Sequence, residues 1–95
     1  MDFASRATAD LYNGIDSKAA RKLVPDALRQ RAIDKLTLLD AATTLEQLRI
    51  PPSNHLEKLK GGRVGRHSIR INDRYRICFR WTAGGPSDVE IVDYQ

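Results

Sequence analysis

The sequence predicts one α+β domain over residues 1–95, in which N-terminal helices pack on one face of a C-terminal antiparallel β-sheet. Three observations support this fold class. Apolar residues recur every three or four positions from Pro25 to Ala42, which is the spacing of an amphipathic helix. After Pro51-Pro52 the apolar period changes to two, which is typical of strands with one buried face. A chain of 95 residues has room for one modest hydrophobic core.

The helical half is expected to contain one long helix and several short ones. Pro25 suits the first position of the long helix, and the Asp26 carboxylate suits the positive end of its dipole. Asn13-Gly14 is a common helix-ending pair and should stop the first short helix. The short helical segments are expected at Ala4 to Asn13, Lys18 to Leu23 and Leu45 to Arg49.

The strand half should form an antiparallel meander of three strands. Asn72-Asp73 and Gly84-Gly85-Pro86 are typical of tight connections between them. In the central strand, alternation separates an apolar face from a basic face. We expect the helices to cover the apolar face and to leave the basic face open, with Cys78 partly exposed there. The strands are expected at His67 to Asn72, Arg74 to Trp81 and Asp88 to Tyr94. The apolar face carries Tyr75, Ile77, Phe79 and Trp81, and the basic face carries Arg74, Arg76, Cys78 and Arg80.

Positive charge concentrates in the strand half. The chain has 16 Lys and Arg against 12 Asp and Glu, and eight of the basic residues fall between Glu57 and Arg80. This balance points to nucleic acid or to an acidic partner. No apolar run is long enough for a membrane span, the first residues lack the apolar core of a signal peptide, and a single cysteine excludes an internal disulfide. We therefore expect a cytoplasmic protein, and the sequence contains neither a Cys/His metal cluster nor a Gly-rich phosphate loop.

The strand half also carries a recognisable pattern. The segment LEKLKGGRVGRHSIRINDRYRICFRW and the terminal DVEIVDYQ resemble the C-terminal half of HigB-type toxins, members of the RelE superfamily of bacterial toxin–antitoxin systems. The helical segment KLTLLDAATTLEQLRIPPSNHLE is similar to the family pattern LDAAT…L…L…PPGNRLE. The resemblance covers nearly the whole chain. Its most specific part is SIRIND-x-YRICFRW followed by VEIVDY.

The resemblance implies a compact RelE-like, microbial-ribonuclease-like fold and an endoribonuclease that cleaves messenger RNA in the decoding site of the ribosome. The implied reaction needs no metal or other cofactor. The ribose 2′-hydroxyl attacks the adjacent phosphorus and leaves a cyclic phosphate and a free 5′-hydroxyl. The implied partners are the ribosome, its messenger RNA and a HigA-type helix-turn-helix antitoxin, with operator DNA contacted only through the antitoxin. No membrane partner is expected.

Such a reaction needs a base, positive charge on the phosphorane and a proton for the leaving oxygen. Arg76 is expected to clamp the phosphate because its strand position puts a guanidinium fork on the open face; the alternative is a solvated arginine. Asp93 would lie near Arg76 as a base or orienting group, or would form an internal salt bridge. Tyr94 is either a base-stacking platform or a packing residue. By the resemblance, Lys60 holds the scissile phosphate, or else protects a hairpin edge, and Glu57 is a second general base or has no role.

One position departs from the family pattern. The resemblance implies a terminal DYH whose histidine contributes to catalysis, whereas this chain ends in Gln95. An amide can position substrate but cannot shuttle a proton. Either this lineage uses other residues for proton transfer, or, as we hypothesise, the histidine was replaced deliberately so that a lethal protein could be produced. The alternative function is therefore a non-catalytic RNA- or antitoxin-binding form that acts as a ribosome binder or as a co-repressor with its antitoxin.

The remaining polar candidates are assigned to binding or to no role. His55 is expected to be solvated and not catalytic, and His67 either touches RNA or lies at the sheet edge. The polar face of the helix from Pro25 to Ala42 is either only solvated or a docking surface for the antitoxin, and the first short helix is a second candidate for that surface. Phosphate contacts position a protein without reading sequence, so the other basic residues are expected to contact the ribosomal RNA backbone. They are Lys58, Arg63, Arg66, Arg70, Arg74 and Arg80.

Overall fold

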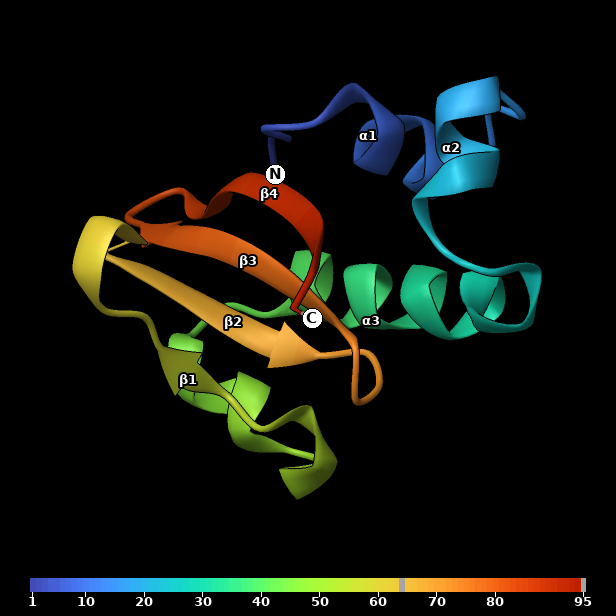
Figure 1. Cartoon of the computed structure of the whole chain (residues 1–95). Helices are drawn as coiled ribbons and strands as arrows, with labels where there is room; N and C mark the ends of the chain where they lie inside the picture. Colours follow the sequence, from blue (N-terminus) through green and yellow to red (C-terminus); the bar gives the residue numbers. More distant parts are fainter. Residues whose placement is uncertain (64, 95) are drawn as a thin grey trace.

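Two layers form the structure, with helices on one side and a sheet on the other (Figure 1), which confirms the predicted α+β class. The structure is a computed structural model that describes residues 1–63 and 65–94. Within these residues the sheet has four antiparallel strands in the order β1-β2-β3-β4. The helices are α1 (Arg6–Tyr12), α2 (Lys18–Leu23) and α3 (Arg29–Ala41). The strands are β1 (Glu57–Lys58), β2 (Arg66–Arg70), β3 (Tyr75–Thr82) and β4 (Gly85–Asp93). Short 3-10 helices are η1 (Asp26–Leu28), η2 (Leu45–Arg49), η3 (Pro52–Asn54) and η4 (Gly61–Arg63).

Serine side chains begin both short α-helices. Ser5 Oγ accepts a hydrogen bond from the Thr8 N–H at 3.1 Å, and Ser17 Oγ accepts one from the Ala20 N–H at 3.1 Å. These caps satisfy amides that the first helical turn leaves unpaired. α1 ends just before Gly14, whose φ of 74° is favourable for glycine. Both helices lie within the segments that the sequence predicts.

The long helix begins one turn later than predicted. The first turn after Pro25 is the 3-10 helix η1, closed by a hydrogen bond of 2.9 Å from the Leu28 N–H to the Pro25 carbonyl. Tight turns of this kind are common at helix ends. α3 then runs for 13 residues and buries Ala32, Leu36 and Leu39, which belong to the predicted apolar stripe. No helix of the described chain has both the length and the apolar character that crossing a bilayer requires.

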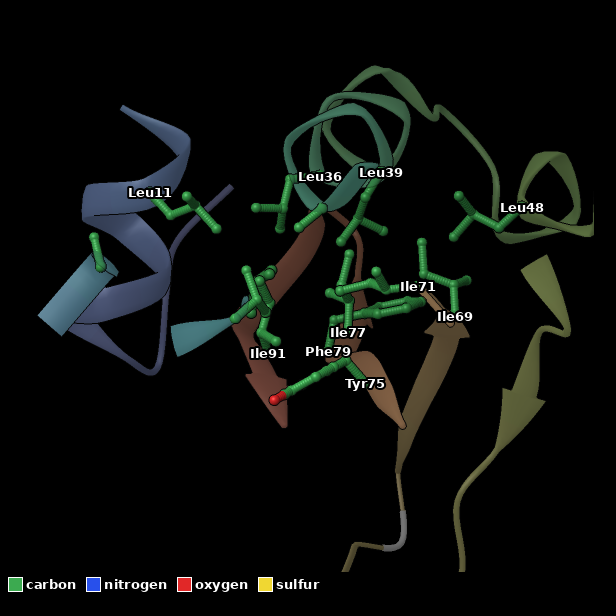
Figure 2. Close-up of a cluster of buried hydrophobic side chains, with 14 residues drawn as sticks. Leu11, Leu36, Leu39, Leu48, Ile69, Ile71, Tyr75, Ile77, Phe79 and Ile91 are labelled. Carbon is green, nitrogen blue, oxygen red and sulfur yellow. The ribbon is translucent and has the colours of Figure 1, made fainter. Parts of the chain in front are cut away.

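The hydrophobic core lies between α3 and the central strands (Figure 2). Leu36 and Leu39 of α3 point toward Ile77 and Phe79 of β3, and all four side chains are fully buried. Burying a side chain of this size stabilises a fold by roughly 1.5–3 kcal/mol. The predicted apolar face of β3 is therefore the face that the helices cover, and its opposite face is directed away from them.

The sheet register aligns a row of isoleucines under α3. Ile69 of β2 pairs with Ile77 of β3, which pairs with Ile91 of β4. The prediction of three strands is wrong by one, because β1 adds a fourth strand beside β2. β1 has only two residues and both are exposed, so its sequence carries no alternation that could have indicated a strand.

The N-terminal residues cover the outer edge of β4. Phe3 forms a parallel bridge with Val89, and the Val89 N–H donates to the Asp2 carbonyl at 3.0 Å. The Asp2 carboxylate accepts hydrogen bonds from the Asp88 N–H at 2.8 Å and from the Ser87 hydroxyl, and these bonds lower the pKa of Asp2 below 3.8. A covered edge is protected from pairing with strands of other chains.

Candidate functional site

Arginines of β2 and β3 lie opposite one another on the sheet face that points away from α3. The register places Arg70 opposite Arg76, and Arg66 opposite Arg80. Like charges directly opposite on neighbouring strands repel each other, so this arrangement requires counter-charges.

Carboxylates supply those counter-charges, and most of these carboxylates lie outside residues 57–80, where the basic residues concentrate. The ion pairs are Arg66 with Glu90 (3.5 Å), Arg70 with Asp73, Arg74 with Asp93 (2.7 Å), Arg76 with Glu57 (3.9 Å) and Arg80 with Asp88 (3.3 Å). Three of these acids belong to β4. The basic face therefore carries less uncompensated positive charge than its arginine count suggests.

The expectation that Arg76 lies on an open face is wrong. Only 8% of Arg76 is exposed, because the chain after η3 passes next to its guanidinium. Arg76 Nε donates to Ser68 Oγ at 2.8 Å, and Nη2 donates to the His55 carbonyl and to the Ser68 carbonyl. Cys78, expected to be partly exposed, is fully buried on the same face. Arg76 thus holds the loop before β1 against β2.

One end of this guanidinium nevertheless borders a cleft. The cleft has a volume of about 310 Å³ and is lined by His55, Glu57, Arg70, Asn72, Asp73, Arg76 and Tyr94. Nη1 of Arg76 faces the Glu57 carboxylate at 3.9 Å, and the Tyr94 ring lies 6.0 Å from the Arg76 Cζ. Tyr94 is 44% exposed, so its ring is accessible to a ligand. We call this space the first cleft.

The connection between β2 and β3 fixes one wall of the first cleft. Asn72 Oδ1 accepts hydrogen bonds from the N–H groups of Arg74 at 3.0 Å and Tyr75 at 2.8 Å. The Ile71 N–H donates to the Tyr75 carbonyl at 3.0 Å and closes the turn. Side-chain bonds of this kind are the reason that Asn favours turns. The predicted tight connection at Asn72-Asp73 is confirmed.

His55 is the cleft residue that sequence reasoning set aside. It follows η3 in a left-handed conformation with φ of 45°, its carbonyl accepts from Arg76, and its exposed side chain lines the cleft. No signal in the sequence marks this position, because the left-handed backbone at His55 breaks the extended alternation that would relate it to Glu57.

Several predicted site residues lie elsewhere. Asp93 Oδ2 accepts hydrogen bonds from Arg74 Nε at 2.9 Å and Nη2 at 2.7 Å, and this bond raises the pKa of Arg74. This contact agrees with the second of the two alternatives for Asp93, in which it forms an internal salt bridge. Asp93 and Lys60 are not among the described residues that line the first cleft. Gln95 lies outside the described residues, and Arg63 ends η4.

The other predicted RNA-binding residues spread around the sheet. Lys58 of β1 is exposed, and so is Lys60 just after it; neither forms an ion pair with the part of the chain that the structure describes. Arg66, Arg74 and Arg80 pair with acids of β4 and are absent from the described lining of the first cleft. The structure therefore brings together Glu57, Arg70, Arg76 and Tyr94 of the predicted set.

His67 belongs to the core side of the sheet. Its ring stacks on Phe79 with centroids 6.2 Å apart, and its Nδ1 is buried without a hydrogen-bond partner among the described residues. Burial, followed by the charges of Lys58 and Arg49, lowers the pKa of His67 below 6.5. β1 pairs outside β2, so the sheet-edge alternative for His67 is wrong.

Over residues 1–63 and 65–94, no three side chains of His, Cys, Asp or Glu are grouped so that they could share a metal ion.

Comparison with known proteins places the chain among toxins. A family model described as the RelE-like toxin of the type II toxin–antitoxin system HigB matches residues 2–95. Toxin HigB-1 of Vibrio cholerae serotype O1 is 43% identical over 84 residues, which are 88% of this chain and 85% of that protein. An uncharacterized protein of Haemophilus influenzae is 34% identical over 58 residues, which are 61% of this chain and 57% of that protein.

Proposed function

This chain belongs to the HigB-like family of RelE-like toxins from type II toxin–antitoxin systems, and we propose that it is an endoribonuclease that cleaves messenger RNA on the translating ribosome. Membership in a type II system implies an antitoxin partner. The observation that carries the proposal is the first cleft, where two guanidinium groups, two carboxylates, an imidazole and an accessible aromatic ring meet.

The two arginines suit a phosphate in its transition state. When the 2′-hydroxyl attacks phosphorus, negative charge builds on the non-bridging oxygens, and preorganised positive groups stabilise that charge most. Arg76 is preorganised, because Nε and Nη2 are held by Ser68 and His55 while Nη1 borders the cleft. Arg70 lines the same cleft and reaches it from the neighbouring strand.

Proton transfer falls to Glu57 and His55. The carboxylate of Glu57 accepts the proton of the attacking 2′-hydroxyl, and the imidazole of His55 gives a proton to the leaving 5′-oxygen. As the P–O5′ bond breaks, a 2′,3′-cyclic phosphate and a 5′-hydroxyl end are formed. Both side chains are exposed and line the cleft, so substrate can reach them. In this proposal His55 takes the role of the terminal histidine of the family pattern, whose position is occupied here by Gln95. An imidazole can donate or accept a proton near neutral pH, whereas an amide cannot.

The remaining groups contribute to RNA binding and not to proton transfer. Tyr94 offers its ring to a base next to the scissile phosphate, and stacking of this kind contributes about 1–3 kcal/mol per base. Lys58 and Lys60 are exposed without an ion pair in the described chain, so they suit the phosphates of ribosomal RNA. Asp93 orients Arg74 at the end of β4.

The test is to map new RNA ends. Purified toxin is added to ribosomes translating a defined messenger, to ribosomes stalled before initiation, and to the messenger alone. New ends that carry a 5′-hydroxyl and occur only during translation are the expected result.

Ribosome binding without any new ends would support the competing function, a non-catalytic binding form. Each of the five described arginines from Arg66 to Arg80 is ion-paired, and this pairing, together with the amide at Gln95, favours that second candidate. Substituting Gln95→His in the same assay separates the two: cleavage that requires this change would assign the chemistry to position 95 and not to His55.

A further inference from the structure

A second cleft lies on the other side of the β2–β3 connection. Its volume is about 560 Å³, and it is lined by Arg31 and Lys35 of α3, Ser53 of η3 and residues 70–73. Arg70, Asn72 and Asp73 line both clefts, so one strip of chain separates the two spaces. The proposed reaction does not use Arg31, Lys35 or Ser53.

Positive charge predominates in this second cleft. Arg31, Lys35 and Arg70 line it, against the single carboxylate of Asp73 among the described lining residues. Asp73 pairs with Arg70. Arg31 is exposed, and its guanidinium forms no ion pair within residues 1–63 and 65–94. Its charge is therefore available for a ligand.

Lys35 is held in place by a buried anchor. Its Nζ donates to Asn54 Oδ1, and Asn54 is fully buried. Asn54 Nδ2 donates to the carbonyls of Leu48 at 3.2 Å and Ile50 at 3.3 Å, which fixes the amide. A lysine ammonium has three N–H donors, so two remain for another acceptor after the bond to Asn54. The exposed Ser53 next to Asn54 adds a hydroxyl donor.

We propose that the second cleft binds a backbone phosphate of the RNA strand that enters the first cleft, one or two nucleotides from the scissile phosphate. This inference rests on the proposed function. The held ammonium of Lys35, the hydroxyl of Ser53 and a guanidinium without an ion pair in the described chain match the non-bridging oxygens of a phosphate. An RNA strand carries a phosphate at every nucleotide, so one strand can occupy both clefts across their shared wall.

The lining argues for RNA and against a protein partner. Ile71 is the only apolar residue of the described lining, and protein interfaces usually depend on apolar or aromatic anchors buried in a pocket. A phosphate contact requires only charge and donors, which the second cleft supplies.

The experiment measures binding of RNA that cannot be cut. A three-nucleotide RNA and a five-nucleotide RNA that extends it by one nucleotide at each end both carry 2′-O-methyl groups, and fluorescence anisotropy gives their affinities for the full chain. The wild type should bind the longer RNA more tightly. Arg31→Gln should weaken binding of the longer RNA about five- to tenfold and lower its salt slope by about 0.7, the value for one phosphate of a single strand. Binding of the shorter RNA should change less than about twofold.

Arg29→Gln is the matched control, because it removes the same charge from the same helix outside the lining of either cleft. Two results would overturn the proposal. One is equal weakening of binding by Arg29→Gln and Arg31→Gln, and the other is equal affinity of the wild-type chain for the shorter and the longer RNA. Weaker binding of the antitoxin by Arg31→Gln with unchanged RNA binding would also overturn it and assign the cleft to a protein contact. Because 2′-O-methyl RNA is not cleaved, tight binding without any messenger cleavage on ribosomes would refute the nuclease function and leave the second cleft standing.

Discussion

Replacing Arg76 with alanine should both destabilise the protein and abolish RNA cleavage. The side chain is almost fully buried and donates to Ser68 Oγ at 2.8 Å, to the Ser68 carbonyl and to the His55 carbonyl. A hydrogen bond to a charged group contributes about 1.5–3 kcal/mol net, and a buried acceptor left unsatisfied costs a similar amount. The Ser68 acceptors are buried, whereas the loop at His55 is exposed and can bond to water.

The expected loss is therefore about 2–4 kcal/mol. A domain of this length has a total stability of roughly 5–14 kcal/mol. A loss of that size should lower the melting temperature by roughly 8–32 °C, since each kcal/mol corresponds to about 4–8 °C in a small domain. Arg76→Lys should recover only part of the stability, because an ammonium cannot reach Ser68 and His55 together as a guanidinium fork does.

Chemical denaturation and thermal melts of the purified chain measure this loss. Arg74→Gln is the control, because Arg74 is half exposed and its ion pair with Asp93 lies at the surface, where such pairs contribute about 0–1 kcal/mol. If Arg76→Ala were as stable as Arg74→Gln, the guanidinium would not anchor the loop before β1, and the preorganisation argument for the first cleft would be lost.

Two further outcomes are expected. Burial and the neighbouring charges of Lys58 and Arg49 lower the pKa of His67 in the folded state, so its contribution to stability is complete above the unfolded value near 6.5 and is lost as pH falls below it. The urea midpoint should therefore drop between pH 7.5 and pH 5.5, by less in His67→Gln than in His55→Gln; equal drops would refute this cause. Glu57→Gln should slow cleavage on ribosomes about 10²–10⁴-fold, the usual contribution of a general base, with a change in melting temperature of only a few degrees. Unchanged cleavage by Glu57→Gln would remove Glu57 as the base.

The fold could be predicted from the sequence wherever a pattern extends over several residues. The apolar stripe of α3 and the alternation of β3 each repeat often enough to define a face. β1 has two exposed residues and no repeat, and it is visible only through its pairing with β2. The late start of α3 depends on the 3-10 bond from Leu28 to Pro25, which propensity alone does not distinguish from an α-helical turn.

The candidate site was less predictable, because it depends on contacts between distant segments. Alternation correctly put Arg76 on the face away from α3, but its burial comes from the chain after η3, 21 residues earlier in the sequence. Likewise, the acids that neutralise Arg66 and Arg80 come from β4 and become visible only with the strand register. His55 could not be assigned to the cleft without knowing that its carbonyl binds Arg76.

In the proposed function, the chemistry is confined to the first cleft and is not a property of the basic face as a whole. Arg70 and Arg80 lie on that same face and both are ion-paired, but only Arg70 lines the cleft. Single-turnover cleavage of a messenger on programmed ribosomes, compared for Arg70→Gln and Arg80→Gln, is the most direct test. We expect at least about a tenfold slower reaction for Arg70→Gln and a change within about twofold for Arg80→Gln, because charge on the phosphorane is stabilised only by groups that reach it. Equal slowing by both substitutions would show that the basic face acts as a whole and that the first cleft is not the site of the chemistry.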